Sequence, residues 1–186
     1  MPSLDILRRQ REVHDLREEN QILREQVAFL QGHPTLAKGL KGESIVAKLV
    51  HGAMMARNAP YDVLARRGGF RLEVKYSGLL EAVRGCRTRR WVWTKLFGES
   101  GKKAYHRLIL VGLADQRFSR MYKDSRAPFV LFDVPITEVA ELSVSAGKYR
   151  AIHLTTNPLT ARSVRSSKLF GHYQLTASEL RARYGL

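Results

Sequence analysis

Hydrophobic residues recur with helical spacing over the first thirty positions of the chain. With heptad position a at Ile6, Val13, Asn20 and Val27, position d holds Arg9, Leu16, Leu23 and Leu30. Apart from Arg9 this is the apolar seam of a coiled coil, and a lone asparagine at a favours two parallel strands in register. We therefore expect residues 1–32 to form a dimerisation helix. The alternative is an amphipathic helix that folds back onto its own domain.

A second helical pattern follows the break at Gly32 and Pro34, which together end the first helix. It runs from about Thr35 to Asn58 and places leucine, valine and methionine side chains on one face. Glu43 falls on that same face, where a carboxylate costs free energy unless it is paired or ligates something. The alternative is that Glu43 only favours the positive end of the helix dipole.

The segments beyond the second helix have the lengths and patterns of strands. Residues 61–65 and 70–75 flank a Gly68-Gly69 turn and predict a β-hairpin. Residues 107–113 and 129–134 are continuous apolar runs, which are typical of central strands covered on both faces. A short helix is expected after Pro135, and Thr176 with Glu179 forms a capping box that begins a terminal helix. The order predicts an α/β core.

Composition and charge narrow the class of partner. The 186 residues are 44% hydrophobic, which is enough for one globular domain of residues 35–186 beside the first helix. The formal charge of +15 points to a polyanion, either nucleic acid or a membrane surface. We expect no membrane-spanning segment, since no apolar run approaches about 20 residues, and a cytoplasmic location. A single cysteine, Cys86, excludes an internal disulfide and a cysteine-rich zinc site.

The predicted hairpin brings chemically useful side chains together. Side chains alternate along a strand, so Glu73 and Lys75 share a face, and Asp62 on the neighbouring strand can face Glu73. Two carboxylates with open positions suit a catalytic Mg²⁺, which polarises phosphate oxygens and acidifies bound water. The implied chemistry is phosphodiester hydrolysis. The alternative is a solvated strand face with an unimportant ion pair.

These residues resemble the PD-(D/E)XK nucleases, a family that includes many type II restriction endonucleases and the archaeal type of Holliday-junction resolvase. The resemblance covers roughly residues 42–115 and rests on Asp62, then Glu73-Val74-Lys75, with Glu43 upstream on a helix. It implies the family's mixed sheet flanked by helices, Mg²⁺ with Mn²⁺ as a possible substitute, and metal ligation at Asp62, Glu73 and Val74. Lys75 would hold the attacking water. The sequence departs from the pattern at Tyr61, which separates Pro60 from Asp62.

Basic residues with the character of a DNA-binding surface lie in two later regions. The predicted contacts are Arg84, Arg87, Arg89, Arg90, Lys95, Lys102, Lys103, Asn157, Arg162, Arg165 and Lys168. Most such residues contact phosphate, while Asn157 and the arginines near it are candidates for reading base edges. Trp91 and Trp93 lie within the first region, and we expect core packing for at least one of them. Stacking on unpaired bases is the alternative.

The sequence as a whole predicts a Mg²⁺-dependent DNA endonuclease that dimerises through its first helix. A homodimer places two active sites in two-fold relation, which matches a short palindrome in duplex DNA and favours a type II restriction endonuclease. A nuclease selective for branched DNA is the first alternative, and a basic DNA-binding protein without catalysis is the second. Asp115 and Asp133 are spare candidates for metal ligands, and we expect solvated loop positions for both.

Overall fold

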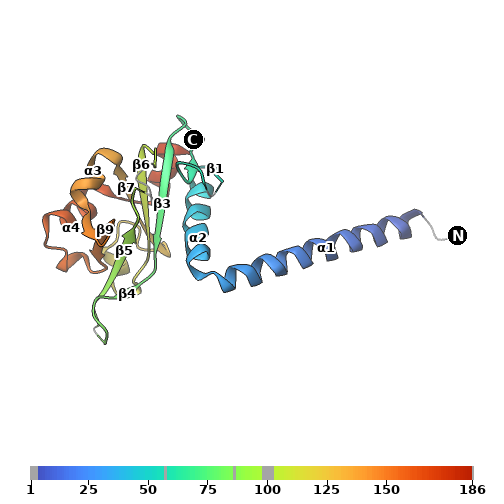
Figure 1. Cartoon of the computed structure of the whole chain (residues 1–186), viewed down its shortest axis with the longest axis horizontal. Coiled ribbons are helices and arrows are strands. Elements are labelled where there is room, and N and C mark those ends of the chain that lie inside the picture. The colour runs from blue at the N-terminus through green and yellow to red at the C-terminus, as the bar shows by residue number, and fades with distance from the viewer. Residues whose placement is uncertain (1–3, 57, 86, 98–102, 186) are drawn as a thin grey trace. The chain divides into compact units, whose positions relative to one another are not determined.

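The computed structural model describes residues 4–56, 58–85, 87–97 and 103–185, apart from the side chains of residues 4–11 and 26. Its α-helices are α1 (Leu4–Gly32), α2 (Pro34–Leu49), α3 (Ile136–Leu142), α4 (Val164–Lys168) and α5 (Ala177–Tyr184). Its strands are β1 (Ala53–Met54), β2 (Val63–Leu64), β3 (Arg71–Ser77), β4 (Leu80–Glu81), β5 (Arg89–Thr94), β6 (Arg107–Leu113), β7 (Phe129–Pro135), β8 (Val144–Ala146), β9 (Tyr149–Thr155) and β10 (Gln174–Leu175). Single helical turns are η1 (Gln116–Met121), η2 (Pro158–Thr160) and η3 (Leu169–Tyr173). The protein therefore has a mixed α/β fold (Figure 1).

The chain divides into two compact units, residues 1–38 and 39–186. This division lies a few residues beyond the expected boundary at residues 32–35. The helix predicted for residues 1–32 is confirmed as α1, and its described seam residues Val13, Leu16, Leu23 and Val27 are each about half exposed. Asn20 donates a hydrogen bond to the Leu16 carbonyl oxygen one turn earlier, at 3.0 Å. Dimerisation through this seam stays a prediction.

The second helix is shorter than the sequence pattern predicts. It ends at Leu49, where we expected Asn58, because the chain must turn sharply to place β1 beside β2. His51 adopts a positive φ of 47°, and a Cβ atom at Gly52 would lie 2.5 Å from the Leu64 carbonyl oxygen. Met54, expected on the core face of the helix, is exposed in β1.

The larger sheet has six strands in the order β1-β2-β3-β6-β7-β10. Strands β3 and β6 pair in parallel, and the other neighbours pair antiparallel, so the sheet is mixed. The predicted hairpin is confirmed: β2 pairs with β3, and Gly68 and Gly69 both have the positive φ that glycine adopts most readily. The predicted strand at residues 61–65 covers only Val63–Leu64. The two apolar runs are confirmed as the central strands β6 and β7.

A second sheet, which the sequence did not predict, has four antiparallel strands in the order β4-β5-β9-β8. It packs against the larger sheet through two fully buried tryptophans of β5. The indole N–H of Trp91 donates to the Leu113 carbonyl oxygen at 2.8 Å, and that of Trp93 donates to the Val111 carbonyl oxygen at 3.1 Å. Core packing is thus confirmed for both tryptophans.

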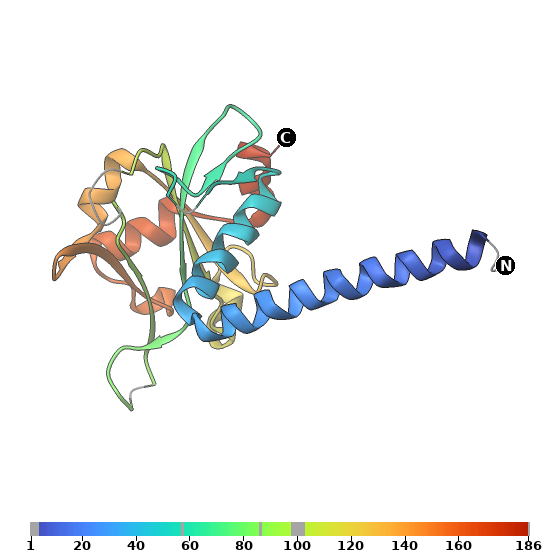
Figure 2. The same ribbon diagram turned by 45° about the vertical axis from the view of Figure 1, so that its right-hand side comes forward.

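Two hydrophobic clusters cover the two faces of the larger sheet, because alternate side chains of its central strands point to opposite faces. Leu108 and Leu110 of β6 belong to the cluster under the second sheet, and Ile109 and Val111 belong to the other. Helix α2 covers that other face and lies along β3 in both ribbon views (Figures 1 and 2). The face carries part of the candidate site.

The remaining helices begin as the sequence indicates. Helix α3 follows Pro135 directly, and α5 has the full capping box: the Thr176 hydroxyl accepts from the Glu179 N–H while the Glu179 carboxylate accepts from the Thr176 N–H. Among the described residues, no helix combines the length and apolar character that crossing a bilayer requires.

Candidate active site

Asp62 lies at the open edge of β3, immediately before strand β2 begins. Its backbone N–H donates to the Leu72 carbonyl oxygen at 3.0 Å, which continues the hairpin register one residue beyond β2. Its side chain then replaces the missing strand: Oδ2 accepts a hydrogen bond from the Val74 N–H at 2.8 Å. An edge N–H that would otherwise lack a protein partner is satisfied, and the bond fixes the orientation of the carboxylate.

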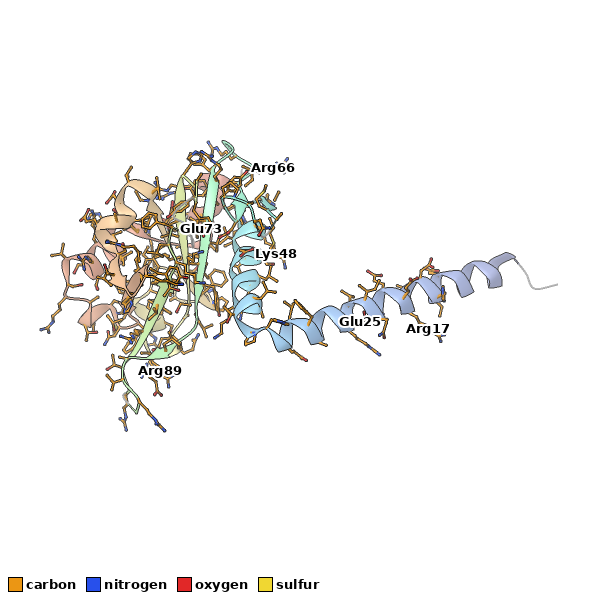
Figure 3. The ribbon with its side chains drawn as sticks, in the orientation of Figure 1. Arg17, Glu25, Lys48, Arg66, Glu73 and Arg89 are labelled. Carbon is orange, nitrogen blue, oxygen red and sulfur yellow. The ribbon has the colours of Figure 1, made fainter. Side chains whose placement is uncertain are left out.

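Glu73 and Lys75 point to the same face of β3, as strand alternation requires. The Glu73 side chain is fully buried, and Lys75 Nζ lies 2.5 Å from Glu73 Oε1. Figure 3 labels Glu73, which projects from the first half of β3. Burial raises the pKa of Glu73 above its usual value, although Lys75 opposes this shift. Keeping the Glu73 side chain ionised in this buried position therefore costs solvation free energy.

Lys103 joins the two carboxylates, a role that the sequence did not reveal. Its Nζ atom lies 2.9 Å from Asp62 Oδ1 and 2.8 Å from Glu73 Oε2. We predicted a DNA contact for Lys103, and the only local signal was its place in a basic stretch. Burial alone would lower the pKa of Lys103, but its contacts with Glu73 and Asp62 raise the pKa above its usual value.

Lysine ammonium groups are the partners that the described residues give to Glu73. Oε1 pairs with Lys75, and the buried Oε2 pairs with Lys103 Nζ at 2.8 Å. A carboxylate oxygen is also a ligand for a hard divalent cation. Such a cation would compete with Lys103 for Oε2.

Glu43 approaches the same edge from α2. The helix packs closely on β3 because Gly42 has no side chain: a Cβ there would lie 2.8 Å from Tyr76 Cβ. The pKa of Glu43 is raised, first by burial and then by repulsion from Asp62, while Lys75 lowers it. The structure therefore brings Glu43 into the electrostatic field of Asp62, Glu73 and Lys75, as the sequence predicted.

The fit of this cluster to a divalent metal is partial. Among the described residues, no three histidine, cysteine or acidic side chains converge as a ready ligand set. Mg²⁺, however, is commonly held by one or two carboxylates with several waters. Asp62 Oδ1 and Glu73 Oε2 provide two such oxygens, and both now contact Lys103. The donor set fits the ion, provided that Lys103 moves aside.

The predicted DNA contacts occupy several environments. Arg84 and Arg162 are exposed, and Arg87, Arg89 and Asn157 line a common pocket. Asn157 also caps η2, since its Oδ1 accepts from the Leu159 N–H. These five residues remain at the surface of the second sheet and the loop after it.

Arg90 is half-buried in β5, and its buried Nε has no hydrogen-bond partner among the described residues. Lys95, Arg165 and Lys168 already interact with protein groups. Lys95 Nζ lies 5.1 Å from the centre of the Tyr149 ring. Arg165 donates to the Glu141 carbonyl oxygen, and Lys168 pairs with the carboxylate of Glu138 at 2.6 Å. Lys102 lies outside the described residues.

Asp115 and Asp133 do not occupy the solvated loop positions that we expected. Asp115 is buried and binds Arg117 through both carboxylate oxygens. Asp133 is buried within β7, where Arg107, Arg183 and Tyr184 bind it. Both expectations of exposure were wrong: Asp133 is bound by residues from distant parts of the chain, and Asp115 is bound by the neighbouring Arg117 and by the distant Thr156.

Comparisons with known proteins give no relative: no family model matches the chain, and no curated protein is significantly similar to it.

Proposed function

We propose that the protein is a metal-dependent endonuclease that hydrolyses phosphodiester bonds of DNA, with a PD-(D/E)XK-type site at the open edge of β3. One observation carries the proposal: the carboxylates of Asp62 and Glu73 converge on the Lys103 ammonium there, beside Lys75, so that two acidic side chains already share one cation. Mg²⁺ is the expected cofactor, with Mn²⁺ as a substitute, because the available ligands are hard oxygens. The formal charge of +15 supports a polyanionic substrate.

The residues divide the work according to their geometry. Asp62 Oδ1 and Glu73 Oε2 would hold the metal together with the main chain of Val74, which lies at the same strand edge. When bound, the metal would polarise a phosphate oxygen and lower the pKa of a coordinated water. Lys75 would orient the attacking water and compensate the charge that develops on the phosphate.

Lys103 and Glu43 complete the site in this proposal. Lys103 neutralises the two carboxylates before DNA and metal arrive, and its long side chain can then swing toward the phosphate. Glu43 adds negative charge on the opposite side of the β3 edge. The ionised side chains of Asp62, Glu73 and Glu43 carry three negative charges, and Lys75 and Lys103 carry two positive charges. One excess negative charge remains, which favours the binding of a cation.

The first helix supports a homodimer. Its described seam is exposed and apolar, and Asn20 lies in the middle of that seam. In a parallel pair, Glu12 and Glu19 of one chain would face Arg17 and Arg24 of the other. Two sites related by a two-fold axis would suit a palindromic duplex, so a type II restriction endonuclease is the specific form that we propose.

One observation favours a second candidate, a basic DNA-binding protein without catalysis. Lys103 lies between the two carboxylates in the way that a metal would, so the cluster could be a permanent ion network. Cleavage assays separate the two functions directly.

The test incubates the purified protein with long unmethylated duplex DNA in Mg²⁺ or in EDTA. The wild type is compared with Glu73→Gln and Asp62→Asn, and with Asp124→Asn as a control of equal charge change. We expect discrete fragments that form only with Mg²⁺. In both site variants the cleavage rate should fall by a factor of about 10³ or more, so that the fragments disappear.

Each other outcome has a clear meaning. Cleavage that persists in Glu73→Gln would refute the site. Cleavage of four-way junctions but not of duplex would replace the palindrome-cutting form with a structure-selective nuclease. DNA binding without cleavage of either substrate would establish the second candidate.

A further inference from the structure

A pocket, which we call the arginine pocket, lies at the opposite end of strand β6 from the residue that pairs with Glu73. It has a volume of about 350 Å³ and is lined by the segment that enters β5, by η1 and by the end of β9. Its charged lining residues are Arg87, Arg89 and Arg117, and its hydroxyl groups come from threonines such as Thr155 and Thr160. Among the described residues that line it, none is acidic.

Arg117 is held in place by its neighbours and still has donors to offer. Its Nε and Nη2 bind the two oxygens of the Asp115 carboxylate, and Nη1 donates to the Arg87 carbonyl oxygen at 2.8 Å. These bonds account for three of the five guanidinium N–H groups. Thr156 also donates to Asp115, so the carboxylate is fixed from two sides. The two remaining N–H groups are therefore held in a fixed orientation, in which they can donate to a ligand.

The pocket carries more positive than negative charge. Asp115 offsets Arg117 at close range, and the Arg117 guanidinium holds the pKa of that carboxyl below its usual range. Arg89 meets Glu81 only at 3.8 Å, with both side chains substantially exposed. Such an exposed pair contributes little. Arg87 adds a further charge, so an anion in the pocket would relieve repulsion among the three guanidinium groups.

The lining chemistry is that of a phosphate contact. Arginine, threonine and asparagine are among the side chains that proteins use to hydrogen-bond phosphate oxygens in nucleic acids. The Asn157 N–H contacts the Thr155 hydroxyl at 3.3 Å, and the Thr160 hydroxyl lies 3.4 Å from it, so these polar groups gather at one wall. The guanidinium groups form the wall on the side of β5 and η1.

The position of the pocket relative to Glu73 follows from the sheet register. Glu73 pairs with Leu108 of β6, whereas Asp115 comes seven positions after Leu108, just beyond the end of that strand. At about 3.3 Å per residue the separation is roughly 23 Å. Figure 3 labels Glu73 and Arg89 at separate points of the domain. In B-DNA, at about 3.4 Å per base-pair step, this distance spans about seven steps.

We propose that the arginine pocket binds a backbone phosphate of DNA about seven base-pair steps from the bond that is cut. This inference rests on the proposed function and adds to it a second anchor, remote from the Asp62 and Glu73 cluster. The anchor fixes the duplex relative to the strand edge without contributing to the chemical step. Arg87, Arg89 and Arg117 therefore position the substrate.

The experiment measures fluorescence anisotropy of a labelled 20-base-pair duplex in EDTA, so that no cleavage occurs, across a series of salt concentrations. The test protein is Arg87→Gln/Arg89→Gln, which spares Arg117 because Arg117 also holds Asp115. The matched control is Arg120→Gln/Arg126→Gln, which removes the same charge from two exposed positions that do not line the pocket.

We expect the test protein to bind the duplex about tenfold more weakly than the wild type, because charge-assisted bonds to one phosphate are lost. The slope of log K against log salt should fall by about one, whereas the control should change both values much less. In a parallel arm, a nucleoside monophosphate is titrated into the same proteins.

Four results would overturn the inference. Equal losses in the test and control proteins would show that only net charge matters. Arginine-dependent binding of the mononucleotide alone, with no effect on the duplex, would show a free-nucleotide site. If the wild type binds the duplex but the test protein matches it, the pocket is not an anchor while the proposed function stands. If the wild type does not bind DNA at all, both proposals fail.

Discussion

Two buried carboxylates of this protein, Asp133 and Glu73, each face two cationic side chains, yet they differ in the kind of cation and in whether it is shared. Asp133 accepts from Arg107 at 2.7 Å and from Arg183 and Tyr184 at 2.8 Å. Glu73 pairs with two lysines, Lys75 at 2.5 Å and Lys103 at 2.8 Å, and it shares Lys103 with Asp62.

The difference teaches how a structural acid and a candidate ligand can be told apart. Around Asp133 the rigid guanidinium groups match the carboxylate and leave no position open. Around Glu73 the lysines are mobile point charges, and a second carboxylate, Asp62, lies on the same ammonium group. Carboxylates that converge on one shared lysine favour cation binding, whereas burial and ion pairing alone do not.

The largest effect on stability is expected at Asp133. Asp133→Asn leaves Arg107 and Arg183 without a charged partner, which should cost about 3 kcal/mol and lower Tm by roughly 6–12 °C. Thermal unfolding in EDTA, with Asp124→Asn as control, measures this. Glu73→Gln should shift Tm much less, since burial already disfavours the charged form of Glu73. Equal losses at the two positions would remove the distinction between them.

A smaller effect is expected at Lys103. In Lys103→Gln, Asp62 and Glu73 lose their shared counter-charge, so the metal-free protein should lose about 1–2 kcal/mol. Mg²⁺ should then restore stability, because a competing cation has been removed and binding stabilises the folded state. Thermal scans with increasing Mg²⁺ should show a larger rise in Tm for this variant than for wild type. A rise that is the same in both would mean that the metal does not enter between the carboxylates.

The smallest effect concerns Glu43 and its pH dependence. Burial and repulsion from Asp62 raise its pKa, so between the usual and raised values the folded protein binds more protons than the unfolded chain. Stability contributed by the neutral form is therefore lost as pH rises through this window. Glu43→Gln should raise Tm by roughly 2 °C above the window and leave it unchanged below.

Its control is Glu18→Gln, which neutralises an exposed helical glutamate. If Glu43→Gln lowers Tm at neutral pH, Glu43 does not experience the repulsion that places it in the cluster.

The elements predicted correctly from the sequence are those whose signals are local. The apolar runs of β6 and β7, the two glycines of the hairpin and the capping box at Thr176 each lie within a few residues. The hairpin register also placed Asp62 opposite Glu73. Local patterns are sufficient where the interaction itself is local.

The features that were missed depend on distant contacts. Lys103 reaches Asp62 from 41 positions away, and no spacing rule links them. The strands of the second sheet carry arginine, histidine and threonine beside their buried residues, and β5 was interpreted as a basic surface. Helix α2 was overextended because the turn at Gly52 is imposed by packing against β2.

The hydrogen bond between Asp62 and the Val74 N–H has a practical consequence for anyone who prepares an inactive protein. Strand β3 continues through residues 73–77 beyond its last pair with β2, and a bare strand edge can pair with another molecule and aggregate. Asp62→Ala would uncover one donor on that edge as well as remove a proposed metal ligand. Glu73→Gln leaves the edge covered, so it is the better variant for crystals or complexes with intact DNA.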